Sequence, residues 1–309
     1  MTSMVPSVGI IGAGAVGQAV GGALVAAGVT QRLLVASRTV DQAEALADDL
    51  DDMRATLGSP ARTGAAGVEE LRACAAVVVA VRARFTNLRS ADLRMGGIQA
   101  NAPAIRHLAM QLSGYPGTVL VVTNPVDLMT RLFAEESSCP RVFGIGSSLD
   151  SARYRLTLGR LLGVPAAAVA GHVVGEHGDT SVVCASSTLV NHRPVPVSLQ
   201  QVRDELARRP GRINAGIGRT RCGPAGAVVS ALRLTLGAED GTTELCAPHE
   251  GDWCGIPVRF TGGRAVPFVP PLDSVEDRQL EASRSKLRAA YQAVRGVPLQ
   301  PSPSGRNRP

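Results

Sequence analysis

Short apolar runs alternate with segments of helical spacing in the first half of the chain. Apolar runs at residues 8–11, 33–35, 76–81 and 118–123 predict buried strands. The run at 76–81 is uninterrupted, which is typical of a parallel strand covered on both faces. Apolar residues at helical spacing follow the first run as far as Gly28 and recur over residues 41–50. This alternation predicts βαβ units and a parallel sheet of the α/β class.

The pattern changes after about residue 150. A helix is predicted over residues 151–162, a Val- and Thr-rich segment follows His177, and an amphipathic helix is predicted over residues 275–294. The length of 309 residues suggests about two domains. We expect a dinucleotide-binding domain over residues 1–149 and a substrate domain over 150–297. The polar, Pro-rich residues 298–309 are expected to form a disordered tail.

Composition excludes several classes of partner. The net charge is +6, but the arginines are scattered and only 3% of residues are aromatic, which argues against nucleic-acid binding. Lys286 is the only lysine. The six cysteines form no CxxC pair and no zinc-site spacing, so we expect no metal site and reduced thiols in a cytoplasmic protein. No charge precedes Arg32, yet the glycines in this stretch favour a buried strand and helix over a signal or membrane segment.

A glycine-rich turn follows the first predicted strand. Its pattern is Gly12-x-Gly14-x-x-Gly17, with Ala15 and Val16 between the last two glycines. Gly12 permits a tight turn, Gly14 allows a pyrophosphate to approach the backbone, and Gly17 allows close helix–strand packing. The helix N-terminus then faces the phosphates. The pattern predicts a dinucleotide site, and the alternative is an ordinary strand–helix turn.

The end of the second predicted strand bears on the choice of cofactor. An acidic residue usually stands there to bind the adenosine ribose, whereas this chain has Ser37 and Arg38. No carboxylate repels a 2′-phosphate at this point, and both side chains are suited to binding one. We therefore expect an NAD(P) site that prefers NADPH to NADH. Alternatively, Arg38 is a solvated surface residue and NAD still binds.

A histidine between glycines and acids, in residues 175–179, is the strongest candidate for proton transfer. His177 can donate a proton to a carbonyl oxygen, and Asp150 can hold its other ring nitrogen and raise its proton affinity. Arg153 lies three residues after Asp150 on the predicted helix, and its planar fork fits a substrate carboxylate. The alternatives are a structural histidine and a salt bridge between Arg153 and Asp150.

These motifs together resemble the L-lactate/malate dehydrogenase family over nearly the whole chain. The matching segments are residues 12–17, 123–127, 149–153, 171–179, 220–227 and 255–258. The resemblance implies a doubly wound Rossmann sheet followed by an α+β substrate domain. It also implies hydride transfer between a nicotinamide cofactor and a small 2-oxo acid, in a homodimer or homotetramer.

The resemblance assigns further residues. Asn124 is expected to contact the nicotinamide and the substrate, although an Asn before Pro125 also suits a turn. Arg89 is expected to be the loop arginine that closes over the substrate and polarises its carbonyl, with Arg84 or Arg94 as alternatives. Two more positions match the pocket wall and the cofactor site, Thr220 and Pro224 respectively.

Three departures from the family pattern concern the substrate. Val81 stands where the family has Gly, and residues 85–86 replace a Pro-Gly pair. The specificity position, six residues before Arg89, is Ala83, which leaves room for a larger apolar side chain. Arg82 and Arg84 flank it, so a shift of one residue restores a malate-like cation. The arginines at 219 and 221 are either surface charges or part of an enlarged site. We therefore expect an atypical or larger substrate.

Two other functions stay open at this point. The same machinery in specialised metabolism can reduce an imine or a more elaborate ketone, although Arg153 would then lack its carboxylate. A non-catalytic nucleotide-binding protein is a further alternative of a different class. The presence of His177, Asp150 and Arg153 argues against it.

Overall fold

The computed structural model describes residues 4–86 and 92–296, and the predicted tail at 298–309 lies outside them. One nine-stranded sheet organises the chain, in the order β14-β13-β12-β6-β5-β4-β1-β2-β3. Six of these strands are parallel and come from the first half: β1 (Val5–Ile11), β2 (Thr30–Ala36), β3 (Arg62–Ala65), β4 (Ala76–Val79), β5 (Thr118–Val121) and β6 (Val142–Gly144). Their order is that of a doubly wound dinucleotide-binding fold. The predicted fold class is confirmed.

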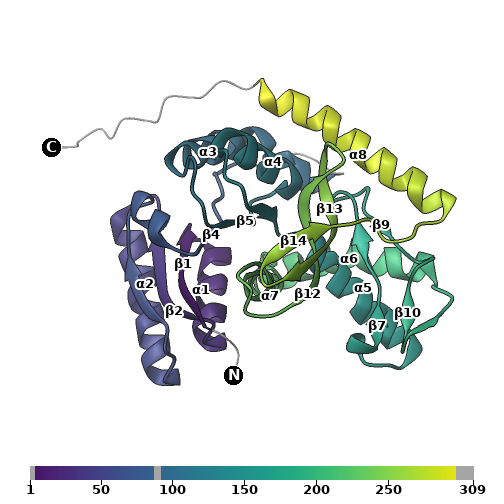
Figure 1. Cartoon of the computed structure of the whole chain (residues 1–309), viewed down its shortest axis with the longest axis horizontal. Coiled ribbons are helices and arrows are strands. Elements are labelled where there is room, and N and C mark those ends of the chain that lie inside the picture. The colour runs from purple at the N-terminus through teal and green to yellow at the C-terminus, as the bar shows by residue number, and fades with distance from the viewer. Residues whose placement is uncertain (1–3, 87–91, 297–309) are drawn as a thin grey trace.

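Helices cover both faces of the parallel strands (Figure 1). One face carries α1 (Ala15–Ala27) and α2 (Val40–Leu57), and the other carries α3 (Ile98–Gln111) and α4 (Val126–Ser137). Two short 3₁₀ turns complete this half, η1 (Glu69–Ala73) and η2 (Leu93–Gly97). Because both faces are covered, every residue of β4 and β5 is buried, as their uninterrupted apolar runs predicted.

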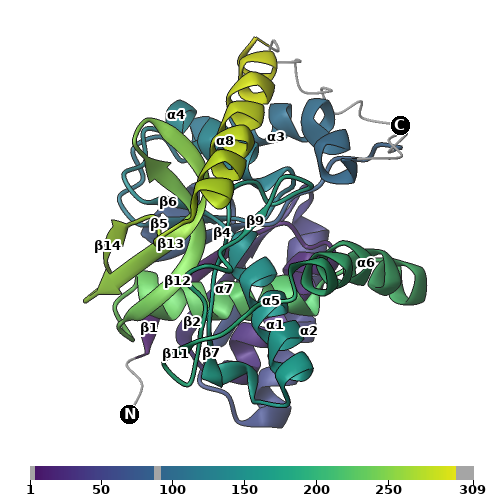
Figure 2. The same ribbon diagram turned by 90° about the vertical axis from the view of Figure 1, so that its right-hand side faces the viewer.

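The second half begins with α5 (Ser147–Leu162), which starts four residues earlier than the sequence predicted. Five short strands and one 3₁₀ turn follow it: η3 (Ala166–Ala168), β7 (Val169–Ala170), β8 (Val173–Val174), β9 (Val182–Val183), β10 (Leu189–Val190) and β11 (Arg193–Pro194). The chain continues through α6 (Leu199–Ile217), α7 (Cys222–Thr235), β12 (Gly241–His249), β13 (Asp252–Thr261), β14 (Arg264–Pro267) and α8 (Ser274–Arg295). Figure 2 shows α5 and α6 on the side away from α3 and α4.

The two halves share one sheet. β12 pairs antiparallel with β6, with Cys246 opposite Gly144, so β12–β14 extend the parallel strands without a break. The main hydrophobic core accordingly runs from Val5 on β1 to Val294 on α8. The domain boundary expected near residue 150 stays a prediction, as do the homo-oligomer and the cytoplasmic location. Within residues 4–86 and 92–296, no helix combines the length and apolarity that a membrane crossing requires.

Candidate active site

The glycine turn between β1 and α1 has the geometry that its sequence predicted. Gly12 has a φ of 116°, and a Cβ there would lie 2.8 Å from the carbonyl oxygen of Ala80 on the neighbouring strand end. A Cβ on Gly17 would overlap the carbonyl oxygen of Gly12. Nothing lies within 4 Å of a Cβ built on Gly14, which is the N-cap of α1. The turn is therefore closed behind the backbone and open in front of it, where a pyrophosphate would approach.

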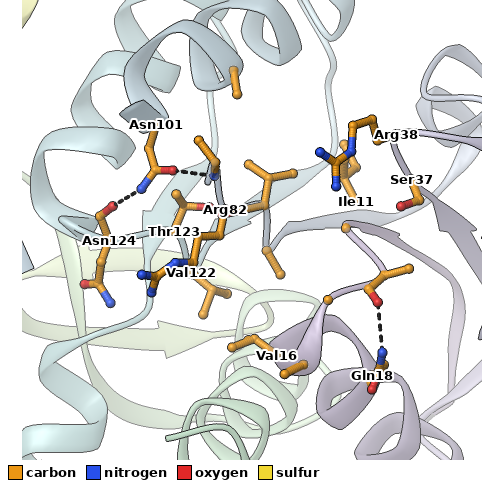
Figure 3. A pocket seen from close by; sticks show the side chains of 18 of the residues that line it. Ile11, Val16, Gln18, Ser37, Arg38, Arg82, Asn101, Val122, Thr123 and Asn124 are labelled. Atoms are coloured by element: carbon orange, nitrogen blue, oxygen red, sulfur yellow. Dashed lines mark hydrogen bonds between the residues drawn. The ribbon is translucent and has the colours of Figure 1, made fainter. Parts of the chain in front are cut away.

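A cavity of about 1640 Å³ runs along the carboxyl ends of β1, β4 and β5 (Figure 3). This edge is where ligands bind in open α/β sheets, next to the point at which the strand order reverses. Ala13, Ala15 and Val16 line the cavity together with Gly12 and Gly14. The volume exceeds the roughly 300–1,000 Å³ of an ordinary small-molecule pocket, so a dinucleotide and a second small molecule have room together.

Ser37 and Arg38 line the end of this cavity opposite Asn124 (Figure 3). The Ser37 hydroxyl lies 3.1 Å from Oε1 of Gln42, and the Thr39 hydroxyl caps α2. Asp49 is the one acidic side chain among the described lining residues. It lies on α2, about 15 Å along the helix from the Ser37–Arg38 turn at roughly 1.5 Å per residue. The end of β2 thus presents a guanidinium and a hydroxyl to the cavity, with no carboxylate beside them.

A buried amide fixes the other end of the cavity. Asn101 on α3 accepts a hydrogen bond from the Ala83 backbone N–H at 2.8 Å and donates one to the Asn124 carbonyl at 2.7 Å (Figure 3). The Thr123 hydroxyl donates to the Val81 carbonyl at 2.8 Å. These bonds join the segment after β4 to the segment after β5. They hold Asn124 and Ala83, both predicted site residues, on the cavity wall.

The three residues predicted for proton transfer and carboxylate binding lie together. Nδ1 of His177 is 2.5 Å from Oδ2 of Asp150, and Nη1 of Arg153 is 3.4 Å from the other oxygen of Asp150. All three residues are less than a tenth exposed. The predicted alternative, an Arg153–Asp150 pair, therefore forms as well. It engages only one nitrogen at a long distance, so the rest of the guanidinium fork is left for another anion.

The backbone around His177 is also held in place. Its N–H donates to Oδ2 of Asp127 at 2.7 Å, and a Cβ on Gly146 would lie 2.6 Å from its ring. Asp127 is buried on α4, three residues after Asn124. Burial, together with the charges of Glu176 and Asp150, raises the pKa of Asp127 to about 7 although it accepts the His177 N–H. Asp127 therefore couples the histidine turn to the strand end that carries Asn124.

The pKa directions in this cluster differ in part from the expectation. Burial and the nearby charge of Arg94 lower the pKa of His177, and they outweigh Asp150, which raises it. Burial alone would raise the pKa of Asp150, but His177, Arg94 and Arg153 bring it below its ordinary value. Asp150 does raise the proton affinity of His177, as predicted, yet the net shift of its pKa is downward because burial, the largest cause, and the charges of Arg94 and Arg153 outweigh Asp150.

Arg94 is the loop arginine that the structure places at this cluster. Its charge acts on His177, Asp150 and Arg153, and its side chain lines the cavity. Arg89, the residue first expected in this role, lies outside the described residues. Arg84, the other alternative, also lines the cavity. Ala83 was predicted as the specificity position because it lies six residues before Arg89. The same spacing counted from Arg94 gives Leu88, which also lies outside the described residues, so the assignment of Ala83 stays a prediction.

Thr220 lines the cavity, and Arg219 beside it does so too. Burial is the main cause of a lowered pKa at Arg82, and the charge of the exposed Arg219 lowers this pKa further. Arg82 extends into the end of the cavity that holds Asn124 (Figure 3). Pro224 lies in the first turn of α7 and is absent from the described residues that line the cavity. Gly17 is also absent from these lining residues, because it is buried behind the glycine turn.

Two site residues were missed by sequence reasoning, Asn101 and Asp127. Asn is unfavourable inside a helix, so an Asn at position 101 within an otherwise helical segment was a usable signal. Asp127 lies in the motif at residues 123–127, but nothing in that motif says that its carboxylate accepts the backbone of a residue fifty positions away. The site thus depends on contacts between segments that spacing alone does not connect.

Comparisons with known proteins agree with this arrangement. Residues 7–144 match the lactate/malate dehydrogenase, NAD binding domain. The chain is similar to an L-lactate dehydrogenase of Deinococcus radiodurans, with 31% identity over 93% of this chain and 99% of that protein. It is also similar to an L-lactate dehydrogenase of Allorhizobium ampelinum, with 30% identity over 91% of this chain and 97% of that protein.

Solved structures share the fold. A minor L-lactate dehydrogenase of Enterococcus mundtii superposes with a TM-score of 0.86 at 24% identity, covering 96% of this chain and all of that one. The malate dehydrogenase of Cryptosporidium parvum gives a TM-score of 0.86 at 24% identity, covering 95% of this chain and all of that one. Full-length sequence similarity and a common fold lead to the same conclusion. The chain belongs to the lactate/malate dehydrogenase family.

Proposed function

We propose that this protein interconverts an L-2-hydroxy acid and the matching 2-oxo acid by hydride transfer with a nicotinamide cofactor, using His177, Asp150, Arg153 and Arg94. The observation that carries the proposal is the cluster in which His177 and Arg153 both contact Asp150, at 2.5 and 3.4 Å, while Arg94 faces all three. Arg94 lines a cavity large enough for a dinucleotide, and its charge acts on the buried proton donor and on Arg153, although His177, Asp150 and Arg153 are not themselves among the described residues that line the cavity.

The residues of the turn fit a dinucleotide. The open space in front of Gly14, the left-handed backbone of Gly12 and the start of α1 form a backbone cradle for a pyrophosphate. When bound, the nicotinamide supplies the hydride in reduction and accepts it in oxidation. Asn124 and Thr220 line the cavity and would contact the ring and the substrate.

His177 supplies the proton. Asp150 lies at Nδ1, so an ionised Asp150 keeps a proton on that nitrogen and leaves Nε2 to exchange one with the substrate oxygen. In reduction, Nε2 of the imidazolium donates to the oxygen of the carbonyl as the carbon is reduced. In oxidation, neutral His177 takes the hydroxyl proton. Asp150 stays ionised throughout and stabilises the imidazolium.

Two arginines supply the binding and the polarisation. Arg153 is buried, and burial with the charges of Arg94 and Arg209 lowers its pKa although Asp150 raises it, so this buried cation is incompletely neutralised by its single long contact with Asp150. A substrate carboxylate would neutralise it and would accept two parallel hydrogen bonds from the free side of the fork. Bound anion also offsets the effect of the arginines on His177, which favours its protonated form. Arg94 then polarises the carbonyl.

The finer choice of substrate follows from a second group of cations. Arg82 and Arg219 lie close enough to interact, both line the cavity, and neither forms an ion pair with an acidic residue in the described part of the chain. Two unneutralised guanidinium groups in a partly desolvated cavity favour an anionic ligand group. We therefore propose a 2-oxo acid with a second anionic group, in place of the larger apolar side chain that Ala83 suggested.

The finer choice of cofactor follows from Arg38. Its guanidinium and the Ser37 hydroxyl face the cavity at the end of β2, where a 2′-phosphate would lie. We propose NADPH as the preferred cofactor. The site argues against the two alternative functions. An imine or a plain ketone has no carboxylate to bind Arg153, and a non-catalytic protein does not require a buried His177–Asp150 pair.

One set of rate measurements tests these points together. Absorbance at 340 nm would give kcat/KM for oxaloacetate and for pyruvate with NADPH and with NADH. We expect turnover, a preference for oxaloacetate, and a preference for NADPH. In the variants Arg82→Ala and Arg219→Ala, kcat/KM for oxaloacetate should fall about tenfold or more, and pyruvate should change little, since one charge-assisted hydrogen bond is worth about 1.5–3 kcal/mol.

Each outcome has a distinct meaning. Failure of every 2-oxo acid with both cofactors contradicts the proposed reaction. Faster reduction of pyruvate than of oxaloacetate contradicts the second anionic group alone. A higher kcat/KM with NADH, unchanged in Arg38→Ala, contradicts the cofactor choice alone. Arg203→Ala on the exposed face of α6 is a matched control, since this arginine donates a hydrogen bond to Gln279 and does not line the cavity.

A further inference from the structure

Lys286, the only lysine of the chain, lies on a helix that is fixed at both ends. At the start of α8, Asp273 and Glu276 form a capping box. At its other end, Arg106 donates hydrogen bonds to the carbonyls of Val294 and Arg295 at 3.0 and 2.8 Å. The helix runs past β9 and β13 toward the turn that carries the catalytic histidine (Figures 1 and 2). A side chain in the middle of α8 therefore projects from a rigid support.

Lys286 joins two carboxylates from distant parts of the chain. Its Nζ lies 2.9 and 2.8 Å from the two oxygens of Glu176, and 2.9 Å from Oδ2 of Asp92. The Glu176 side chain is only 2% exposed, and that of Lys286 is 27% exposed. Burial alone would lower the pKa of Lys286, but the bonds to Glu176 and Asp92 outweigh burial and raise it. Lys286 is thus a charged bridge between Asp92 and the largely buried carboxylate of Glu176.

Further bonds reinforce both arms of the bridge. The Glu176 N–H donates to the Ser283 hydroxyl of α8 at 2.8 Å, and Thr180 donates through its N–H and hydroxyl to the Glu176 carboxylate. On the other arm, the Asp92 N–H donates to Oδ2 of Asp179 at 2.9 Å. Residue 92 is therefore joined to residues 176–179 twice, once directly and once through Lys286.

The two carboxylates flank two residues of the proposed mechanism. Glu176 immediately precedes His177, and Asp92 precedes Arg94 by one intervening residue. We propose, on the basis of the function proposed above, that Lys286 is a positioning residue that holds the Arg94 turn against the His177 turn. The lysine touches neither substrate nor cofactor. It sets how often Arg94 occupies the place from which its charge reaches His177, Asp150 and Arg153.

The proposal predicts a particular kinetic defect. Without the bridge, Arg94 is displaced for part of the time, and a misplacement of about 1 Å at a reacting centre can cost up to about 100-fold in rate. We expect Lys286→Met to lower kcat/KM for the 2-oxo acid by about 10- to 100-fold, mostly through kcat, and to leave the Kd of the cofactor within about twofold. Lys286→Arg keeps a cation on a long side chain and should recover most of the activity.

A control on the same helix separates positioning from stability. Arg288 pairs with Asp252 at 2.7 Å and with Glu281, away from the two turns. Arg288→Met should lower the melting temperature as Lys286→Met does, because each removes an ion pair of α8, but it should leave kcat unchanged. If the two variants have equal kcat below their melting temperatures, Lys286 is merely structural and the proposal is wrong.

The pH profile gives a second and sharper test, which does not depend on Lys286→Met folding. His177 is faced by Arg94 of η2, by Asp150 and Arg153 of α5, and by Asp127 of α4, with Glu176 next to it in the chain. Reduction requires protonated His177, so the alkaline limb of kcat/KM follows its pKa. Asp92→Asn removes an anion, which by charge alone lowers that pKa. Loosening the Arg94 turn has the opposite effect, since less of the arginine's charge then reaches His177.

Asn suits this position because Asp92 has a φ of 52°, a conformation that Asn also tolerates. We expect the alkaline limb to move to higher pH in Asp92→Asn, and the double variant with Lys286→Met to be no slower than Lys286→Met alone. A limb that moves to lower pH, or additive losses in the double variant, would overturn the proposal. If the wild-type protein reduces no 2-oxo acid, the proposed function itself fails, and the two failures are thereby told apart.

Discussion

The two ends of the cavity are built by different means. Among the described residues before 87, Thr30 is the only buried polar side chain, and no charged side chain is buried there. The glycine turn at the proposed dinucleotide end is made of backbone and of the space left by glycines. At the proposed substrate end, the cluster that Arg94 reaches instead buries charged or titratable groups from three separate segments, namely Asp127, Asp150, Arg153, Glu176 and His177.

This difference separates two ways of making a site. Backbone N–H groups and open space recognise a phosphate without a buried charge, so this end costs little desolvation. Buried ions must be paired and hydrogen-bonded, and their pKa values respond to every neighbour. Substitutions in the glycine turn at residues 12–17 should therefore act by steric overlap and independently of pH. Substitutions at the substrate end should act through charge, with effects that depend on pH.

The largest expected effect is at His177. His177→Asn removes the exchangeable proton and keeps a polar side chain of similar reach, so kcat should fall by about 10²- to 10⁴-fold, the usual contribution of a general acid. Cofactor binding, measured by quenching of intrinsic fluorescence or by calorimetry, should stay within about twofold because the two ends share no buried charge. His192→Asn at an exposed turn is the control. A fully active His177→Asn enzyme would contradict the assignment.

A smaller effect is expected at Gly17, where a substitution should change the cofactor Kd by steric overlap. A Cβ there overlaps the carbonyl oxygen of Gly12, so Gly17→Ala must move the turn or the start of α1. The Kd of NAD(P)H should rise at least about tenfold, or roughly 1.4 kcal/mol, and by the same factor at each pH tested. Gly22→Ala, also on α1, has only the Met53 sulfur at 3.7 Å and is the control. Unchanged cofactor affinity in Gly17→Ala would show that the turn does not hold the dinucleotide.

The same contrast explains how much the sequence predicted. The turn at residues 12–17 is contiguous, and each glycine has a local reason, so its geometry followed from spacing. Asp150 and Arg153 were placed correctly on one helix because three residues nearly complete a turn. The strands that precede Ala83 and Asn124 were predicted because uninterrupted apolar runs are typical of a buried parallel sheet.

The substrate end was predicted less completely because it is assembled across the chain. Asn101, Asp127 and Lys286 act through bonds to residues 18 to 194 positions away, and neither periodicity nor motif spacing reports such contacts. The net pKa direction of His177 was not foreseen, since it depends first on burial and then on Arg94, whose approach is set by the path of the chain after β4. Charge contacts between residues far apart in the sequence are therefore the part of this site that is hardest to predict from sequence patterns.

Asp127 provides the smallest and most specific test of the contrast. Its pKa of about 7 in the folded protein lies above the ordinary value of 3.8, and its Oδ1 has no hydrogen-bond partner among the described residues. Between those pH values the folded protein binds a proton that the unfolded chain has released. The contribution of Asp127 to the free energy of unfolding therefore decreases as pH rises through this window, by at most about 1.4 kcal/mol per pH unit for one group.

Asp127→Asn keeps an oxygen for the His177 N–H and removes the ionisation. Other groups titrate in the same range, so the quantity to compare is the difference in free energy of unfolding between variant and wild type, from urea denaturation at several pH values. This difference should move in favour of the variant from about pH 4 to about pH 7 and then level off. For Gly17→Ala the same difference should be flat, because no ionisable group is buried near that turn in residues 4–86. Parallel curves for Asp127→Asn and wild type would mean that Asp127 titrates normally, and that the substrate end carries less electrostatic strain than its burial implies.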